Sequence, residues 1–198
     1  MKQRYGFFGG SFNPVTNAHI NLANLVVEKY NLDKLIFVPV GNKYQKQNLA
    51  DEQHRLEMLK IATENHEKLE VTDIELNLKY ALTTFEAFKR IEEKYQDITP
   101  YFIIGSDNLE KLTIQQEIEL LAKNYKYIIL ERGSKAKEQI SSNVTLKQNE
   151  ENFNILEENP YKKVSSTNVR NNLKDETKLK DMISEEVYEY IKKMNLYN

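Results

Sequence analysis

The sequence predicts an α/β fold, in which an open, mostly parallel sheet carries helices on both faces and a small helical part follows at the C-terminus. The first observation is that the strongest apolar runs, Leu35–Val40 and Tyr125–Leu130, have the length of strands. The second is that such runs alternate with longer segments whose apolar residues recur every three or four positions. This alternation is typical of strand–helix–strand units, whose parallel sheet is covered on both faces.

Taken in order, six segments are predicted as strands: Arg4–Phe8, Lys34–Val38, Leu69–Asp73, Tyr101–Ile104, Lys126–Leu130 and Phe153–Leu156. Four segments between them are predicted as helices with one buried face: Asn17–Tyr30, Asp51–Glu64, Thr83–Tyr95 and Ile114–Asn124.

The sequence changes in character after residue 132. Gly133–Asn152 is polar and fits a surface helix or a mobile connection better than core. From Ser166 onward we expect two short helices separated by Lys174–Lys180. The second of them has an apolar stripe formed by Val187, Tyr190, Ile191 and Met194. We expect one domain over residues 1–198, with an α/β core at about 1–160 and a helical part at about 161–198.

Composition excludes several classes of function. The charge is nearly balanced, with 28 Lys and Arg against 30 Asp and Glu, which argues against a dedicated nucleic-acid binder. The absence of Cys excludes disulfides, thiolate metal sites and a thiol nucleophile, and three His leave little for a protein-held metal centre. No stretch reaches the roughly 20 apolar residues needed to cross a bilayer, so we expect a cytoplasmic protein without a membrane partner, in which a homo-oligomer remains possible.

The segment Gly9–His19 joins the first predicted strand to the first predicted helix. Ligands of open parallel sheets bind beyond the carboxyl ends of the strands, where this turn lies. Gly9 and Gly10 let a phosphate approach the backbone, and the helix that follows offers unpaired N–H groups. The turn is neither a P-loop nor the GxGxxG dinucleotide motif, so a phosphate cradle of another kind is predicted.

Thr16 and His19 lie three residues apart, and at helical spacing they project from the same face. Two roles are open for His19: it either binds the ligand or caps and packs the first turn of the helix.

A second segment, Lys163–Arg170, places three hydroxyl residues at a helix start, with Arg170 about one turn later. Hydroxyl groups, free N–H groups and a guanidinium suit a polyphosphate. A plain Ser/Thr cap beside a solvated Arg is the alternative.

Together these segments resemble the two signatures of the nucleotidyltransferase superfamily. The first signature, G-x-F-(D/N)-P-x-(H/T)-x-x-H, is matched by Gly10, Phe12, Asn13, Pro14, Thr16 and His19. The second, (I/V)-S-S-T-x-(I/V)-R, is matched by Val164, Ser165, Ser166, Thr167, Val169 and Arg170. The resemblance implies a Rossmann-like nucleotidyltransferase fold, and it requires the two segments to converge on one triphosphate.

Within the superfamily the sequence resembles bacterial nicotinate-nucleotide adenylyltransferases over nearly its whole length. The matching segments are Val38–Lys46, His54–Leu59, Gly105–Asp107, Thr84–Glu86, Glu131–Arg132 and Val187–Tyr197. Several positions depart from that family's pattern. Lys43, Tyr44 and Gln45 stand where Pro, Pro and His are usual, and Asn13 and Thr16 replace Asp and His. Gln115 occupies the position of a Trp that stacks on the pyridine ring, and the chain has no Trp.

The resemblance implies transfer of AMP from ATP to nicotinate mononucleotide, which gives nicotinate adenine dinucleotide and pyrophosphate. The catalytic residues it implies are His19, Thr16, Lys46 and Arg170. The ATP-binding residues it implies are Gly9, Gly10, Ser11, Phe12, Gly105, Asp107, Ser166 and Thr167. Thr83, Thr84, Tyr44 and Arg132 are expected at the acceptor. Mg²⁺ is expected to bind through the ATP phosphates, with water as most of its other ligands.

Some of these residues have structural alternatives. Asp107 is either a ribose ligand or the N-cap of the next helix, and Arg132 is either a ligand contact or an exposed residue at a strand end. We expect Arg55 to form a structural ion pair, and His54 and His66 to be solvent-exposed. Two other functions remain open: the same chemistry on another phosphorylated acceptor, such as nicotinamide mononucleotide, and a nucleotide-binding module without turnover.

Overall fold

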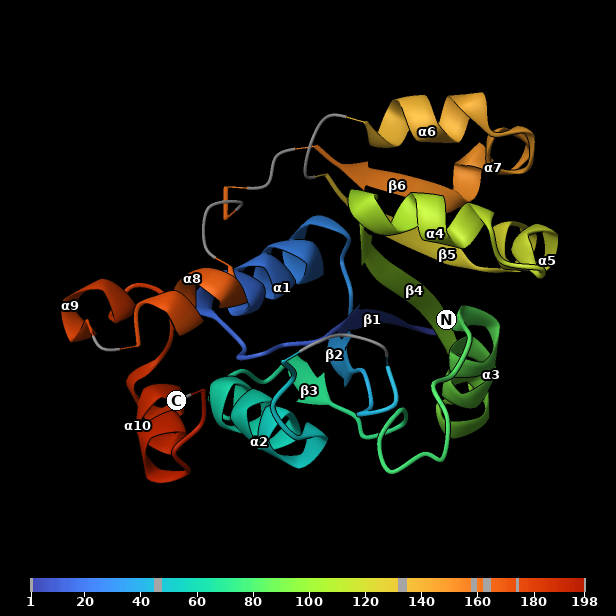
Figure 1. Ribbon diagram of the computed structural model, residues 1–198. Helices are drawn as coiled ribbons and strands as arrows, with labels where there is room; N and C mark the ends of the chain where they lie inside the picture. The colour runs from blue at the N-terminus through green and yellow to red at the C-terminus, as the bar shows by residue number, and fades with distance from the viewer. Residues whose placement is uncertain are drawn as a thin grey trace.

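The computed structural model describes residues 2–44, 48–131, 135–157, 160–161, 165–173 and 175–197. In these residues six parallel strands form one open sheet with the order β3-β2-β1-β4-β5-β6 (Figure 1). The strands are β1 (Gln3–Gly10), β2 (Lys34–Pro39), β3 (Leu69–Val71), β4 (Ile98–Gly105), β5 (Lys126–Leu130) and β6 (Phe153–Leu156). The α/β prediction is confirmed, and all six predicted strands are present.

The helices occupy the connections between strands and the C-terminal part of the chain. They are α1 (Asn17–Lys29), α2 (Glu52–Thr63), α3 (Thr84–Lys94), η1 (Ser106–Asn108), α4 (Leu109–Thr113), α5 (Ile118–Asn124), α6 (Ala136–Ser142), α7 (Val144–Gln148), η2 (Glu150–Asn152), α8 (Ser166–Asn171), α9 (Glu176–Leu179) and α10 (Glu185–Lys193). Three of the predicted helices correspond to α1, α2 and α3, and both ends of each lie within one residue of the expected positions. Asp51 and Thr83 begin two of them as N-caps whose side chains accept backbone N–H groups.

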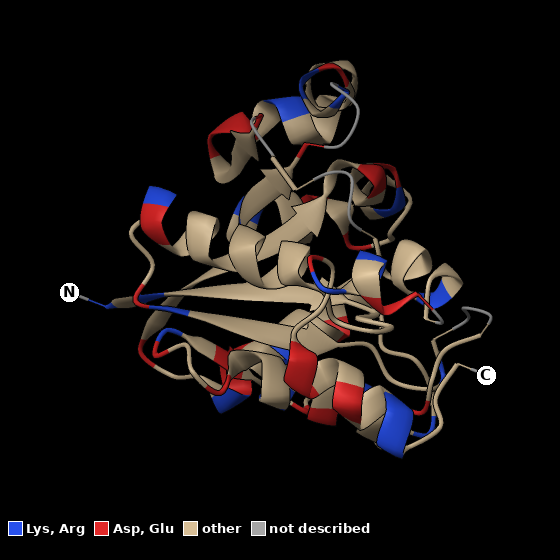
Figure 2. Ribbon diagram, turned by 90° about the vertical axis from the view of Figure 1, so that its left-hand side faces the viewer, with Lys and Arg blue, Asp and Glu red and all other residues tan. Residues whose placement is uncertain are grey.

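Two apolar cores lie on opposite faces of the sheet, because successive strand residues point to opposite sides. Phe8 belongs to the core under α1, α2 and α8 to α10, whereas its neighbour Phe7 belongs to the core under α3 to α7. The same alternation separates Ile103 from Phe102 in β4. Figure 2 shows that charged residues of both signs are spread over the helices and loops, while the middle of the sheet is largely uncharged.

The direction in which the chain adds strands reverses between β1 and β4, which are neighbours in the sheet. Crossover connections then leave toward opposite sides, and a crevice opens beyond the carboxyl ends of these two strands. Gly10 ends β1 and Gly105 ends β4. The two predicted ligand-binding turns therefore lie at this reversal point.

Three predicted segments differ from the structure. The expected helix at Ile114–Asn124 begins only at Ile118, because a turn in which Ile118 N donates to Gln115 O separates α5 from α4. The segment Lys174–Lys180, which was expected to separate two helices, contains a third short helix, α9. Asp175 is its N-cap, and the Asp175 side chain accepts a hydrogen bond from Lys178 N. This N-cap stabilises the start of α9, and Leu179 of α9 packs in the core.

The polar segment at 133–152 is also better integrated than expected. Its described part forms α6 and α7, and Ala136, Ile140 and Leu146 are buried in the core over the sheet. Three apolar side chains in a polar sequence are enough to dock two short helices, because burial depends on their position rather than on mean composition.

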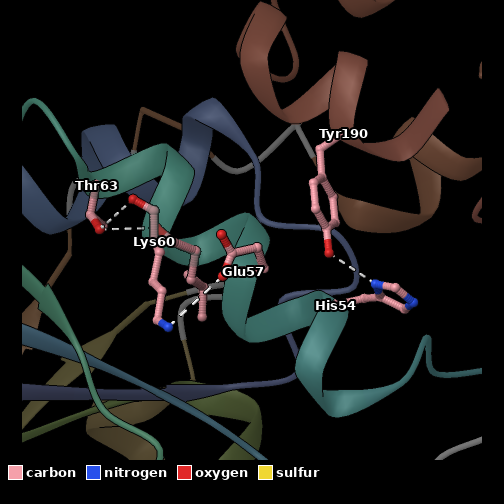
Figure 3. A network of polar contacts seen from close by, with 6 residues as sticks. His54, Glu57, Lys60, Thr63 and Tyr190 are labelled. Carbon is pink, nitrogen blue, oxygen red and sulfur yellow. Dashed lines mark hydrogen bonds and ion pairs between the residues drawn. The ribbon is translucent and has the colours of Figure 1, made fainter. Parts of the chain in front are cut away.

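The C-terminal helix α10 packs beside α2. Figure 3 shows His54 of α2 and Tyr190 of α10 pointing toward each other, with Nδ1 of His54 2.9 Å from the Tyr190 hydroxyl. His66 is also partly buried, with Nδ1 3.4 Å from Nδ2 of Asn24. The expectation that His54 and His66 are solvent-exposed is therefore wrong, since the helical docking partners were not visible in the sequence. Among the described residues, no helix combines the length and the apolarity that a membrane span needs.

Candidate active site

Thr16 and His19 form a capping box at the start of α1. The Thr16 side chain accepts the N–H of His19, and Nδ1 of His19 accepts the N–H of Thr16 at 3.0 Å. The Thr16 hydroxyl also lies 2.8 Å from Nδ1. A capping box usually places Glu or Gln at the position that His19 takes here. Thr16 is therefore a positioning residue, and its side chain is only 2% exposed.

This box determines which ring nitrogen of neutral His19 carries the proton. A backbone N–H can only donate, so Nδ1 must present its lone pair to Thr16. The neutral imidazole then carries its proton on Nε2, which is the donor atom of the ring. The ring is partly buried and packs against Phe12, with centroids 5.3 Å apart. The capping role of His19 is confirmed, and ligand binding through its Nε2 side stays a prediction.

The glycines of the β1 turn have different surroundings. A Cβ built on Gly9 would meet no atom of the described residues within 4 Å, and Gly9 is exposed. A Cβ on Gly10 would lie 2.8 Å from the ring of Phe12. Phe12 is buried and has a φ of 43°, in the left-handed region that a non-glycine residue rarely adopts. The protein therefore needs Gly10 for its own packing, whereas the space above Gly9 is open.

The C-terminal motif contacts this turn directly. Ser166 Oγ donates to Pro14 O at 2.8 Å, and Nη1 of Arg170 donates to Asn13 O at 2.7 Å. Nη2 of Arg170 also lies 3.3 Å from the Thr167 hydroxyl. Figure 1 shows α8 beside the start of α1. Segments about 150 residues apart in the chain are thus in direct contact, as convergence of the two motifs requires.

Arg55 supports the same turn from below. Its side chain is fully buried and donates to three backbone carbonyls: Ala50 O at 2.9 Å, Ser11 O at 3.0 Å and Val40 O at 2.6 Å. The expected ion pair is absent from the described residues, since these carbonyls take up the guanidinium donors instead. Burial lowers the pKa of Arg55, and the nearby charge of Glu52 opposes this effect. One side chain therefore connects the turn after β1 to the loop after β2.

Asn13 joins this support through its side chain. Nδ2 donates to Asn48 O at 2.8 Å, while Oδ1 accepts Ala50 N and the Tyr197 hydroxyl, each at 2.9 Å. Asn suits the position because it must donate and accept at once, which an ionised Asp cannot do. Burial raises the pKa of the Tyr197 phenol, so this hydroxyl stays protonated as a donor.

The turn after β4 places Asp107 at the same edge of the sheet. Gly105 and Ser106 are buried and Asp107 is exposed. The N-cap of α4 is Asn108, so the alternative of Asp107 as the cap of that helix is wrong. Its predicted bond to a ribose stays a prediction.

The acceptor residues predicted from the sequence are only partly placed. Thr83 caps α3 in a box with Glu86, whose Oε2 accepts Thr83 N at 2.8 Å while Glu86 N donates to Thr83 Oγ1 at 3.2 Å. Thr84 is the first residue of that helix. Tyr44 lines a cavity described below. Lys46, Arg132 and Val164 lie outside the described residues.

The chain is similar to known proteins over its whole length. Residues 7–172 match the family described as Cytidylyltransferase-like. The chain is 33% identical over 205 residues to a probable nicotinate-nucleotide adenylyltransferase from Clostridium novyi, and 32% identical over 201 residues to one from Clostridium acetobutylicum. Both alignments cover 100% of each chain. The chain belongs to the nicotinate-nucleotide adenylyltransferase family.

Solved structures show the same fold. A nicotinic acid mononucleotide adenylyltransferase from Plasmodium falciparum, complexed with NaAD, gives a TM-score of 0.78 at 24% identity and covers 98% of this chain and 97% of its own. A putative nicotinate-nucleotide adenylyltransferase from Vibrio parahaemolyticus gives a TM-score of 0.61 at 20% identity, with 98% of this chain and 95% of its own covered. At these identities the likeness concerns the fold alone.

Sequence reasoning missed one residue that shapes the loops at this edge of the sheet. Glu52 is buried in the first turn of α2, where Oε1 accepts Asn77 N at 2.7 Å and Oε2 accepts Asn42 N. It thereby joins the loop after β2 to the loop after β3. Gly41 allows this close approach, since a Cβ there would lie 2.4 Å from Glu75 O. A Glu directly after the N-cap Asp51 has the appearance of an ordinary first-turn acid, so the sequence carried no signal for this contact.

A cavity of about 680 Å³ opens between these loops and α4. Its walls are Lys43, Tyr44, Lys79, Tyr80, Ala81, Leu82 and Lys111. Gln115 is not among them, and its side-chain amide donates to Lys111 O at 3.3 Å. Among the described residues, no group of three or more His, Asp and Glu side chains is arranged to hold a metal.

Proposed function

We propose that the chain transfers AMP from ATP to nicotinate mononucleotide, forming nicotinate adenine dinucleotide and releasing pyrophosphate. The observation that carries this proposal is the contact of the His19 turn with Ser166 and Arg170 at the reversal point of the sheet, in a chain of this family. Residues with hydrogen-bond donors from both ends of the sequence are in contact there, which supports binding of one triphosphate.

The reaction needs positioning more than proton transfer. A phosphate monoester has its second pKa near 6, so the attacking phosphate is mostly dianionic at neutral pH and needs no general base. It attacks the α-phosphorus of ATP, and the bond to the β-phosphate oxygen breaks. The protein must hold two anions together and stabilise the charge that develops on the α-phosphate and on pyrophosphate.

His19 donates from Nε2 to the α-phosphate, where charge increases in the transition state. Thr16 holds the ring in the required tautomer through Nδ1. The phosphates approach the backbone of Gly9, Gly10, Ser11 and Phe12, where Gly9 has open space above it. These donors belong to a turn that is already fixed, so they need little reorganisation during the reaction.

Arg170, Ser166 and Thr167 bind the β- and γ-phosphates and receive the departing pyrophosphate. Ser166 and Arg170 also donate to Pro14 O and Asn13 O, so hydrogen bonds join both parts of the phosphate site. Lys46 supplies a further cation to these phosphates. Asp107, after Gly105, accepts a hydroxyl of the adenosine ribose. Thr83, Thr84, Tyr44 and Arg132 belong to the acceptor side.

The phosphate site contains donors: N–H groups, hydroxyls, an imidazole and a guanidinium. Such groups fit phosphate oxygens and not a cation. Mg²⁺ therefore enters on the phosphates of ATP, with water as most of its other ligands. When bound it neutralises part of the charge on the phosphates. We place the reaction in the cytoplasm, and a homo-oligomer remains compatible with it.

The test is an acceptor panel with ATP and Mg²⁺, measured as pyrophosphate release. Nicotinate mononucleotide should exceed nicotinamide mononucleotide in kcat/KM by more than about tenfold, roughly 1.4 kcal/mol. A smaller ratio, or a faster reaction with another phosphorylated acceptor, contradicts the acceptor assignment. Binding of ATP without pyrophosphate release for any acceptor indicates a nucleotide-binding module.

A further inference from the structure

The segment that follows α10 turns back toward the core. Asn195 has a φ of 53°, in the left-handed region. Its N–H donates to Lys192 O, and the N–H of Leu196 donates to Ile191 O, each at 3.1 Å. This pair of bonds is a Schellman motif, which ends a helix and reverses the direction of the chain. Leu196 and Tyr197 consequently pack against the core that lies under α1 and α2.

Tyr197 reaches the phosphate turn from this segment. Its hydroxyl donates to Oδ1 of Asn13 at 2.9 Å, across 184 positions of the sequence. Its side chain is partly buried, and its φ is 65°. A tyrosine keeps such a left-handed backbone only where the surrounding structure holds it. Tertiary contacts therefore fix the place of this hydroxyl.

Asn13 connects Tyr197 to Arg170. The Asn13 side chain is 4% exposed, and three bonds orient it: Oδ1 accepts the Tyr197 hydroxyl and Ala50 N, and Nδ2 donates to Asn48 O. The backbone oxygen of the same residue accepts Nη1 of Arg170 at 2.7 Å. The Tyr197 hydroxyl is thus two hydrogen bonds away from the guanidinium that we assign to the β- and γ-phosphates.

Tyr197 makes this connection without adding a negative charge. Burial raises the pKa of its phenol, although the charges of Arg170 and Arg55 nearby lower it, so the hydroxyl stays protonated at neutral pH. Every ion pair among the described residues is made by a lysine, so no carboxylate of that part of the chain pairs with Arg170. A carboxylate in place of the phenol would bind the guanidinium and compete with phosphate. A neutral hydroxyl leaves the charge of Arg170 to a bound anion.

We propose that Tyr197 is a positioning residue of the phosphate site, whose hydroxyl acts through Asn13 to hold the Arg170 guanidinium in place for the β- and γ-phosphates of ATP. The inference rests on the proposed function, because it takes the anion at Arg170 to be the triphosphate of ATP. Removal of the hydroxyl leaves Oδ1 of Asn13 bonded to Ala50 N, so no buried acceptor loses its last donor. Tyr197→Phe, which keeps the ring, therefore separates positioning from packing.

The experiment compares Tyr197→Phe with the wild-type protein in three measurements. Titration calorimetry with ATP and Mg²⁺ gives Kd without turnover, pyrophosphate release with nicotinate mononucleotide gives kcat and KM, and thermal unfolding gives Tm. Tyr197→Phe should weaken ATP binding about threefold to tenfold, the range for one neutral hydrogen bond, and should also lower kcat. Tm should change by less than about 3 °C, and KM for nicotinate mononucleotide by less than about twofold. An ATP Kd within about twofold of wild type overturns the inference.

Arg170→Gln identifies the route of the effect. If the hydroxyl acts through the guanidinium, Tyr197→Phe should change the ATP Kd by less than about 1.5-fold in the Arg170→Gln protein, because coupled residues are not additive. The same factor in both proteins indicates a structural role and overturns the inference. If the wild-type protein releases no pyrophosphate, while Tyr197→Phe weakens ATP binding only when Arg170 is present, the inference holds and the proposed function fails.

Two other tyrosines of α10 supply matched controls. Tyr188→Phe removes a hydroxyl that bonds Glu176 Oε1 at 2.9 Å on the surface. Tyr190→Phe removes the contact with His54 of α2 that Figure 3 shows. Neither variant should change the ATP Kd by more than about twofold. A loss of ATP binding in Tyr190→Phe equal to that in Tyr197→Phe would assign the effect to the docking of α10 and overturn the inference.

Discussion

The phosphate end of the proposed site and its acceptor end, at the cavity between the loops after β2 and β3 and helix α4, are built in opposite ways. At the phosphate end, Asn13, Thr16 and Arg55 are buried and their polar groups are bonded to backbone in a dense network. At the acceptor end, the lysines and tyrosines around the cavity are exposed and few of their polar groups are bonded. A triphosphate demands fixed donors because charge develops on it during the reaction. The acceptor ring needs only a matching surface, so this end can change its residues without rebuilding the fold.

The largest effect is expected from His19→Ala. Loss of the Nε2 donor should lower kcat by about 10²–10⁴, as for other donors to developing charge, while ATP binding weakens much less. Steady-state pyrophosphate release and ATP titration measure the two quantities. His66→Ala is the control, since His66 contacts Asn24 away from the site. A kcat within threefold of wild type, which corresponds to a change of about 0.6 kcal/mol in activation free energy, rejects the role given to His19.

Arg55→Met should act on stability first. Three buried carbonyls lose their donor, and at about 1 kcal/mol or more for each bond to a charged group the free energy of unfolding should fall by about 3 kcal/mol. Urea denaturation measures this change. Arg90→Met is the comparison, because its guanidinium has one long bond, 3.4 Å to Ile74 O, and should cost less than about 1 kcal/mol. Equal losses of unfolding free energy in both variants would contradict a stabilising role for the three hydrogen bonds of Arg55.

Glu75→Gln tests the acceptor end through pH. Burial raises the pKa of Glu75 from its ordinary 4.5 to about 7, against the nearby charge of Arg90. Between these values the folded protein binds more protons than the unfolded chain, so this group lowers the free energy of unfolding as pH rises through the window. Glu75→Gln should therefore be more stable than wild type by about 3 kcal/mol above pH 7, and equal to it below pH 4.5.

Urea denaturation at several pH values checks this prediction. Glu67→Gln removes an exposed carboxylate and should differ from wild type by less than about 0.5 kcal/mol throughout. A Glu75→Gln protein that is no more stable at pH 8 than wild type contradicts the burial of an uncompensated carboxylate.

The smallest effect is expected from Gly9→Ala. Its methyl group meets no protein atom, so stability should stay within about 0.5 kcal/mol, while KM for ATP should rise about tenfold because the methyl occupies space meant for phosphate. Gly10→Ala is the counterpart: its Cβ meets the Phe12 ring, and overpacking should cost about 1–3 kcal/mol of stability. An unchanged KM for ATP in Gly9→Ala would place the phosphates elsewhere.

Much of the phosphate end could be predicted before any coordinates. Strand and helix positions follow from periodic apolar residues. Thr16, His19, Ser166 and Arg170 belong to local motifs that can be recognised in the sequence. Their convergence was implied by the family resemblance, and the contacts of Ser166 and Arg170 with the turn after β1 agree with it. The partners of Arg55 could not be predicted, because Ser11, Val40 and Ala50 offer carbonyls that every residue has.

The cavity of about 680 Å³ could not be predicted from the sequence. Lys111, Lys79 and Tyr80 have the appearance of ordinary surface residues, and only the approach of three loops makes them walls of one cavity. The helices and strands follow from local backbone geometry and from which side chains are buried, and the sequence pattern within each segment shows both. Which carbonyl faces a guanidinium, and which lysines share a space, depend on contacts between distant segments, and only the folded arrangement decides them.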